Sequence, residues 1–409
     1  MWRQKVHYHR HRKGVPMDRR DRLIARAKQG YRLAYGAEPS RFFAAPGRVN
    51  LIGEHTGPSG GYVLSCAINR DTIIALGPAD TNETGRKLHV VAIDMGSARC
   101  AVDLEAPNAR GDNSWENHVR AIAARLQEAR HALRPARLAI AGDIPLGAGL
   151  ASSASLGVGI ALALSDYNNL SLSPHTLAEI AYSAEQEFVG SAASIADHLA
   201  IACASDGRAL LIDCARLEHM PIPIAAKLAI MVIDTGIRRP HGDDVFAVRA
   251  VQCAATAQHC GVASLRDLTP DELRRQTADL DPLLYARARH VVQDIALVEP
   301  AAIALARGDV ALLGEVLAAS QASLSRDYEV SPPAIDRLVD LIAKALGSAG
   351  GVRLTGEGFG GCLVAAVHED ASDIVHEVIE KRYNPRAALP ARTEVICASS
   401  GAAVVRQIA

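Results

Sequence analysis

The segment that most constrains the fold runs from Pro145 to Ser155 and reads PLGAGLASSAS. It follows ARLAIAG, an apolar stretch typical of a strand, and leads straight into LGVGIALAL, which is typical of a helix. Gly147 and Gly149 allow the backbone to approach an anion closely, and a helix N-terminus supplies free N–H groups and a partial positive charge. Strand, glycine-rich loop and helix in this order predict a mixed α and β fold with a phosphate site.

Two hydroxyls strengthen the phosphate interpretation, because Ser152 and Ser153 offer ligands for phosphate or Mg²⁺. A bare run of glycine and serine is more often a small-residue turn packed on a strand, but the flanking strand and helix make this run more specific. The chain contains no G-x-x-x-x-G-K-[ST] motif, which excludes a Walker-type nucleotide site.

A second glycine cluster, residues 356–361, formally matches the G-x-G-x-x-G pattern of dinucleotide-binding proteins. The residues that follow it, CLVAAV, are typical of a strand and not of a helix. We therefore predict a turn between two strands, which lies beside a ligand or beside another loop.

Strands and helices do not alternate one for one along the chain, so an α+β fold fits better than a doubly wound sheet. Strand patterns occur at residues 62–68, 136–142, 208–214, 228–234 and 362–367, and helical periodicity occurs at 115–130, 175–188 and 334–346. The Ser-Asp-Gly turn near residue 206 is the best candidate for a boundary. We predict two domains, 17–206 and 207–409, after a basic, disordered tail at residues 1–16.

Composition excludes several classes of protein. Hydrophobic residues make up 49% and charged residues 22%, and 44 Lys and Arg nearly balance 45 Asp and Glu. This is a soluble globular composition, so we expect no nucleic-acid partner, no membrane partner and a cytoplasmic monomer or weak dimer. The eight cysteines show no metal-ligand spacing and predict reduced, mostly buried thiols. The role of the His-rich tail stays open.

The most unusual stretch is APGRVNLIGEHT, residues 45–56, and it resembles the N-terminal signature of galactokinases, members of the GHMP small-molecule kinase superfamily. Four further segments are similar to that family in the same order. They are the glycine-rich loop at 145–155, EQEFVGSAASIADH at 185–198, SLSRDYEVS at 323–331 and RLTGEGFGGC at 353–362. Because five ordered motifs do not coincide by chance, the chain is identified as a member of the galactokinase family. The resemblance implies a two-domain α+β fold with an active site in the interdomain cleft.

The resemblance also implies roles for individual residues. Arg48 and Asp197 match the catalytic pair, in which the aspartate orients the acceptor hydroxyl and takes its proton late. Ser153 and Glu185 match the residues associated with Mg²⁺. The implied contacts of ATP are Trp115, Pro145, Gly147, Gly149, Leu150, Ser152, Ser153 and Ala154, with Trp115 at the border of the adenine pocket.

The acceptor side departs from the family pattern. Glu54 and His55, which the family uses at the C6 end of the sugar, are present, but Gly57 stands where galactokinases have an aspartate for the C3 and C4 hydroxyls. Three further replacements fall in the same region: Phe246 for a tyrosine, Ser194 for a glycine and His198 for a glutamine. Glu357 and Ala151 replace a small residue and a serine on the phosphate side.

These inferences predict an ATP- and Mg²⁺-dependent sugar 1-kinase of galactokinase type that forms an α-sugar 1-phosphate. Substrate contacts are expected from Glu54, His55, Gly57, Ser194, His198 and Phe246. Two alternatives remain: a kinase for another small hydroxyl metabolite, since the superfamily includes mevalonate and homoserine kinases, and a silent sugar and ATP sensor. The altered acceptor side predicts that galactose is a poor substrate or one of several.

Overall fold

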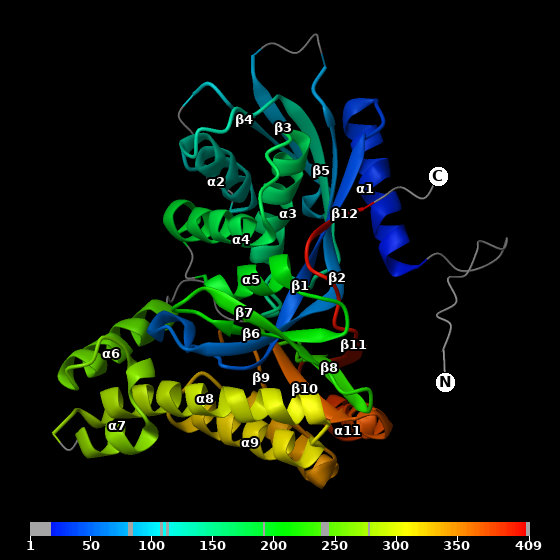
Figure 1. The fold of residues 1–409 in the computed structure, drawn as a ribbon. Helices are drawn as coiled ribbons and strands as arrows, with labels where there is room; N and C mark the ends of the chain where they lie inside the picture. Colours follow the sequence, from blue (N-terminus) through cyan, green and yellow to red (C-terminus); the bar gives the residue numbers. More distant parts are fainter. Residues whose placement is uncertain are drawn as a thin grey trace, which may run out of the picture.

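The computed structural model describes residues 18–80, 85–106, 109–111, 114–190, 193–238, 245–276 and 279–405. Within them the chain forms two β-sheets, each covered by helices, and the predicted α+β fold is confirmed (Figure 1). The predicted basic tail at residues 1–16 lies outside the described residues.

The larger sheet has the strand order β12-β1-β2-β5-β3-β4, and β6 and β7 continue from β2. β3 and β5 pair in parallel, whereas the other pairs are antiparallel. Its strands are β1 (Arg41–Ile52), β2 (Tyr62–Pro78), β3 (Lys87–Ala92), β4 (Ala98–Asp103), β5 (Ala136–Gly142), β6 (Arg208–Asp213), β7 (Glu218–Pro223) and β12 (Ala403–Val405).

Helices cover both faces of the upper part of this sheet (Figure 1). Because side chains alternate along a strand, Ile73 and Ala75 of β2 pack in one cluster with residues of α1, while Ile74 and Leu76 pack in another with residues of α3. Burial on both faces explains why the strands are apolar at successive positions. The helices are α1 (Arg19–Tyr35), α2 (Ser114–Glu128), α3 (Ser152–Tyr167), α4 (Pro174–Ser183) and α5 (Ile195–Cys203).

The smaller sheet is antiparallel, with the order β11-β8-β10-β9. Its strands are β8 (Leu228–Asp234), β9 (Gly350–Leu354), β10 (Cys362–His368) and β11 (Arg392–Ile396). The accompanying helices are α6 (Val245–His259), α7 (Pro270–Gln276), α8 (Pro282–Arg307), α9 (Val310–Arg326), α10 (Pro333–Leu346) and α11 (Ser372–Val378). α9 and α10 pack against β9, at the edge of the sheet.

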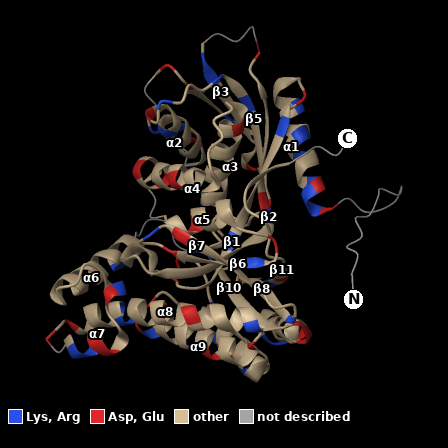
Figure 2. Ribbon diagram, in the orientation of Figure 1, with Lys and Arg blue, Asp and Glu red and all other residues tan. Residues whose placement is uncertain are grey.

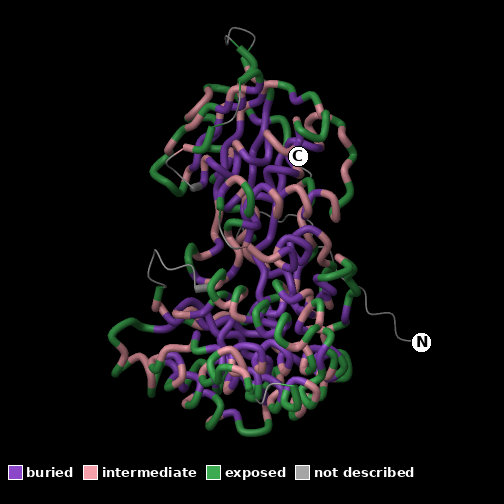
Figure 3. The backbone as a smooth tube through the Cα atoms, turned by 90° about the vertical axis from the view of Figure 1, so that its left-hand side faces the viewer, coloured by how far each residue is buried: buried purple, intermediate pink, exposed green. Residues whose placement is uncertain are grey.

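One hydrophobic cluster joins the two sheets. It contains Val49 and Leu64 from the larger sheet, Ile230 and Val364 from the smaller sheet, and Leu305 from α8. Figure 3 shows buried segments running through both halves of the molecule and the region between them. This shared core fixes the loops of one half against those of the other.

The predicted elements are confirmed, with small shifts at their ends. The helix predicted at 175–188 continues from α4 into a π-helix, η3 (Ala184–Val189), and the glycine cluster 356–361 connects β9 to β10 as expected. The domain boundary near residue 206 stays a prediction. β6, β7 and β12 follow that residue in sequence but belong to the larger sheet, so the chain crosses between the sheets more than once.

Acidic and basic residues are interspersed over both halves in the view of Figure 2. Among the helices of the described residues, none combines the length and the apolar character needed to cross a bilayer.

Candidate active site

The glycine-rich loop joins β5 to α3 and brings the first turn of that helix to a cavity. Its backbone has positive φ at Gly147 (65°), Gly149 (79°) and Ala151 (57°), a region that glycine adopts without steric cost. Ala151 is the N-cap of α3, and its side chain has no oxygen to satisfy the first N–H groups of the helix. The start of the helix, with Ser152 and Ser153, lines the cavity and suits an anion.

The second glycine cluster packs directly against this loop. A Cβ on Gly149 would lie 3.1 Å from the carbonyl oxygen of Thr355, and a Cβ on Gly356 would lie 2.9 Å from the Cα of Gly149. Close backbone approach therefore demands glycine at both positions. The turn after β9 lies beside another loop, and residues of both loops line the same cavity.

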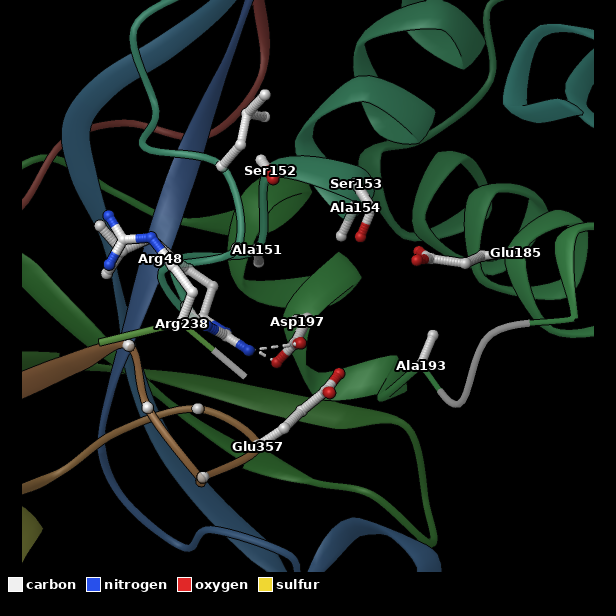
Figure 4. A pocket seen from close by; sticks show the side chains of 18 of the residues that line it. Arg48, Ala151, Ser152, Ser153, Ala154, Glu185, Ala193, Asp197, Arg238 and Glu357 are labelled. Atoms are coloured by element: carbon white, nitrogen blue, oxygen red, sulfur yellow. Dashed lines mark hydrogen bonds and ion pairs between the residues drawn. The ribbon is translucent and has the colours of Figure 1, made fainter. Parts of the chain in front are cut away.

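Arg48 and Asp197 form a paired charge at the centre of the site (Figure 4). Arg48 lies on β1, where the register with β2 shifts after Pro46, and Asp197 lies in the first turn of α5. Arg48 donates from Nε to Asp197 Oδ1 (2.7 Å), from Nη2 to Oδ2 (2.5 Å) and from Nη1 to the carbonyl of Gly149 (2.6 Å). Burial by itself lowers the pKa of Arg48, but the surrounding carboxylates, Asp197 foremost, raise it overall. The guanidinium is therefore a fixed positive charge.

Glu185 lies in the π-helix after α4, opposite Ser153 across the cavity (Figure 4). π-Helical segments inside α-helices are rare and often occur at functional sites. Burial alone raises the pKa of Glu185, but hydrogen bonds and charge from His198, the charge of His118 and the Ser153 hydroxyl lower it to about 2. The carboxylate is thus ionised at neutral pH and sits beside a hydroxyl, as a hard cation requires.

His198 is completely buried behind Glu185. Its Nδ1 donates to the carbonyl of Ser194 (3.0 Å), and its Nε2 lies 3.0 Å from Oε2 of Glu185. His198 therefore lines the large cavity and not the small one, although its ring contacts the backbone of Ser194.

The predicted phosphate-side residues converge on one cavity of about 650 Å³, hereafter the large cavity. Pro145 is half-buried and is not part of its lining. The predicted residues that line the large cavity are Arg48, Gly147, Gly149, Leu150, Ser152, Ser153, Ala154, Glu185, Asp197 and His198.

Sequence reasoning missed Arg238, which reaches the same cavity from the segment after β8 (Figure 4). Its guanidinium is held by Asp234, with Nη1 to Oδ1 at 2.7 Å and Nη2 to Oδ2 at 2.8 Å. Glu357 also lines the cavity and points into it (Figure 4). The residues next to Arg238 form no motif that indicates a phosphate contact. Only the fold brings its side chain to the glycine-rich loop.

Trp115 lines a separate apolar cavity of about 120 Å³. This cavity shares Leu146 and Ser152 with the large cavity, so the two adjoin at the glycine-rich loop. Ile140 and Met95 are among its other walls. An apolar slot beside an anion site suits a nucleotide base next to its phosphates, which agrees with the predicted position of Trp115.

The predicted acceptor residues lie on the other side of Arg48 and Asp197. They line a cavity of about 40 Å³, hereafter the small cavity, which Arg48 and Asp197 also line. Its other predicted members are Glu54, His55, Gly57, Ser194 and Phe246.

The Glu54 carboxylate is bonded to Arg353 and Gly356 from the other half of the molecule and to Asn50 from β1. Its Oε2 accepts from Nη1 of the buried Arg353 (2.9 Å), and its Oε1 accepts from the backbone N–H of Gly356 and from Asn50 Nδ2 (3.2 Å). Burial raises the pKa of Glu54 although Arg353 and Arg48 oppose this. Glu54 thus ties the signature at residues 45–56 to the segment at 353–362, a role that the sequence did not reveal.

His55 lines the small cavity with a strained backbone (φ 65°) and a buried ring. The ring centroid lies 4.6 Å from that of Tyr328 and 5.7 Å from that of Phe246. Within the described residues, neither ring nitrogen has a hydrogen-bond partner. Burial lowers the pKa of His55 well below its usual value, so a neutral imidazole offers one donor and one acceptor to a ligand.

The residues on the phosphate side fit a nucleoside triphosphate with Mg²⁺. The helix start and Arg238 suit phosphate oxygens, and the ionised Glu185 with Ser153 suits the metal. Among the described residues, no three His, Cys, Asp or Glu side chains form a closed metal site. Mg²⁺ in phosphoryl-transfer enzymes takes only one or two protein ligands, so such a site is not needed.

Comparison with known proteins agrees with this geometry. The galactokinase galactose-binding signature matches residues 29–78, the GHMP kinase N-terminal domain matches 117–205, and the GHMP kinase C-terminal domain matches 301–384. The crystal structure of Lactococcus lactis galactokinase complexed with galactose superposes with a TM-score of 0.86 at 27% identity, over 93% of this chain and 99% of that chain.

More distant structures share the fold alone. Methanococcus jannaschii mevalonate kinase matches with a TM-score of 0.58 at 18% identity, over 88% of this chain and 99% of that one. Homoserine kinase from Cytophaga hutchinsonii matches with a TM-score of 0.56 at 15% identity, over 89% and 97%. With its three matched segments and its close structural similarity to a galactokinase, the chain belongs to the galactokinase family of the GHMP kinases.

Proposed function

We propose that this chain is an ATP-dependent sugar 1-kinase, which phosphorylates the anomeric hydroxyl of galactose or a related hexose and releases the α-sugar 1-phosphate. The observation that supports this most is the position of Arg48 and Asp197, which line both the large and the small cavity. A phosphoryl group in the first cavity and a hydroxyl in the second would meet at this pair.

The chemistry follows from the charges at that junction. The acceptor oxygen forms a bond to the γ-phosphorus, the bond from phosphorus to the β,γ-bridging oxygen breaks, and its electron pair leaves with ADP. Asp197 orients the acceptor hydroxyl and takes its proton. Because a carboxylate is a weak base, the proton moves late, after most of the charge has developed on the phosphoryl group.

Arg48 supports the transfer in two ways. Its bidentate bonds hold both oxygens of Asp197, and its third bond, to Gly149, ties it to the phosphate loop. A fixed cation at this place stabilises the negative charge that spreads over the transferred group. Mg²⁺ held by Glu185 and Ser153 would neutralise the β- and γ-phosphate oxygens.

An ADP-release assay over hexoses, pentoses, and deoxy and amino sugars tests the proposal, with Asp197→Asn as the inactive control and identification of the phosphorylated position in the product. We expect ADP and an α-sugar 1-phosphate in equal amounts. Transfer to a non-sugar alcohol such as mevalonate or homoserine would favour another kinase activity. Binding of sugar and ATP without any ADP release would favour a silent regulator.

A further inference from the structure

A second space adjoins the small cavity on its acceptor side. This side cavity has a volume of about 250 Å³ and shares Gly57, Pro58, Ser194 and Phe246 with the small cavity. At about 10–15 Å³ per water-sized probe, it has room for several heavy atoms beyond those that the small cavity can hold. The space available to an acceptor therefore extends beyond the small cavity.

Gly57 lines both cavities at the place where they adjoin. This residue lies in the 3₁₀ turn η1 (Gly57–Ser59) and is not among the residues with positive φ, so the backbone does not require glycine there. A Cβ at this position would lie 3.2 Å from Oγ of Ser194 and 3.9 Å from Sγ of Cys214. Any larger side chain would crowd Ser194 and reduce the space where the two cavities adjoin.

The walls of the side cavity are uncharged. Pro58, Ile195, Phe246, Ala247 and Ala250 supply apolar surface, and Tyr182, Gln186 and Ser194 supply neutral hydrogen-bonding groups. A carboxylate, phosphate or ammonium group would lose its hydration here without gaining a counter-charge from these walls. An uncharged group with an apolar part and one polar atom would be well accommodated.

We infer that the preferred acceptor is a hexose that carries a small uncharged substituent, such as an ether or acylamido group, on the ring edge that faces Gly57. The substituent occupies the side cavity while the anomeric hydroxyl lies at Arg48 and Asp197. This inference rests on the proposed sugar 1-kinase activity and adds the substrate class to it.

The test compares kcat/KM for galactose with kcat/KM for its 2-acetamido-2-deoxy, 3-O-methyl and 4-O-methyl derivatives. We expect at least one derivative to exceed galactose by about tenfold or more. If every derivative is at least tenfold poorer than galactose, the inference is wrong while the sugar kinase activity stands. If neither galactose nor any derivative supports ADP release, the proposed function fails and the inference fails with it.

A cavity-filling variant locates the effect. Ala250→Leu, on the α6 wall of the side cavity, should lower the ratio of kcat/KM for the favoured derivative to that for galactose by at least about tenfold. Ala255→Leu, on an exposed position of the same helix, is the matched control and should leave the ratio unchanged. Ala247→Leu, also on the cavity wall, provides an independent second variant. An unchanged ratio in both wall variants would overturn the inference.

Discussion

The two sides of the Arg48–Asp197 pair differ in how closely they follow the galactokinase family. On the phosphate side, the loop glycines, Ser153 and Glu185 keep the family pattern and line the large cavity, whereas Ala151 and Glu357 are the departures there. On the acceptor side, Gly57, Ser194 and Phe246 depart from it, and all three line both the small and the side cavity. This contrast agrees with the proposed function, in which the phosphoryl transfer is retained and the acceptor differs from galactose in shape.

This difference has a physical origin. Phosphoryl transfer needs a cation, an anion-binding loop and a base in fixed positions, so each replacement there costs rate. An acceptor pocket needs only to be complementary to its own substrate. Two replacements together can therefore change the pocket from one shape to another. Gly57 and Ser194 are such a pair, because the side chain missing at one position leaves space beside the hydroxyl present at the other.

Removing the shared carboxylate should have the largest effect. Asp197→Asn should lower kcat by at least about 10²-fold, because an orienting and proton-accepting group is lost, and should leave ATP affinity nearly unchanged. Steady-state kinetics and nucleotide titration measure the two quantities. Asn is preferred to Ala because Ala would leave the buried Arg48 unpaired, at a cost of about 3 kcal/mol in stability. Turnover close to that of the wild type would contradict the assigned role.

Restoring the family residues at positions 57 and 194 should increase the discrimination between sugars on the acceptor side. Gly57→Asp alone should lower activity, because its side chain meets Ser194, and Ser194→Gly in the same chain should relieve the clash. The double variant should discriminate galactose from glucose about 10- to 150-fold better than the wild type, the range expected for a hydrogen bond to a charged group. Values of kcat/KM for both sugars in all four proteins test this. Additive single effects would show that the two positions do not interact.

Removing a hydroxyl on the phosphate side should affect the use of ATP and Mg²⁺ and not that of the sugar. Ser153→Ala should raise the ATP or Mg²⁺ concentration needed for half-maximal rate by about tenfold, roughly the weight of one hydrogen bond, with little change in the KM for sugar. Ser165→Ala, at a buried position further along α3, controls for helix stability. A change confined to the KM for sugar would mean that the two sides are assigned the wrong way round.

The smallest effect concerns the acid stability of the acceptor side. Asp213 accepts two hydrogen bonds from Arg266, which also donates to the carbonyl of Gly60, and this lowers the pKa of Asp213 to about 2. The stabilisation is present above about pH 4, the unfolded value, and is lost as the pH falls through about 2. The ion pair is partly open to solvent, so we expect about 1–2 kcal/mol.

Denaturant unfolding of the wild type and of Asp213→Asn between pH 6 and 3 measures this contribution. The wild type should be more stable at pH 6, and the difference should shrink as the pH falls. A constant difference across this range would show that the carboxylate charge of Asp213 is not responsible.

The sequence by itself determined the local elements and the phosphate loop. Strand and helix periods are properties of neighbouring residues, so ARLAIAG and the helix after Ser152 were recognised without the fold. The ordered motifs identified Arg48, Ser153, Glu185 and Asp197, and the structure brings all four to one cavity. His198 was expected on the acceptor side, and its ring lies between Glu185 and the backbone of Ser194, a position that depends on the packing of α5 and not on local sequence.

Tertiary structure decided the contacts between residues far apart in the chain. The approach of Gly149 to Gly356, the Glu54–Arg353 pair and the arrival of Arg238 at the phosphate loop all join the two sheets. The space beside Gly57 also depends on tertiary structure, because residues of α5 and α6 line the side cavity together with Gly57. These contacts depend on how the shared core sets one half against the other, and local propensity carries no information about that arrangement.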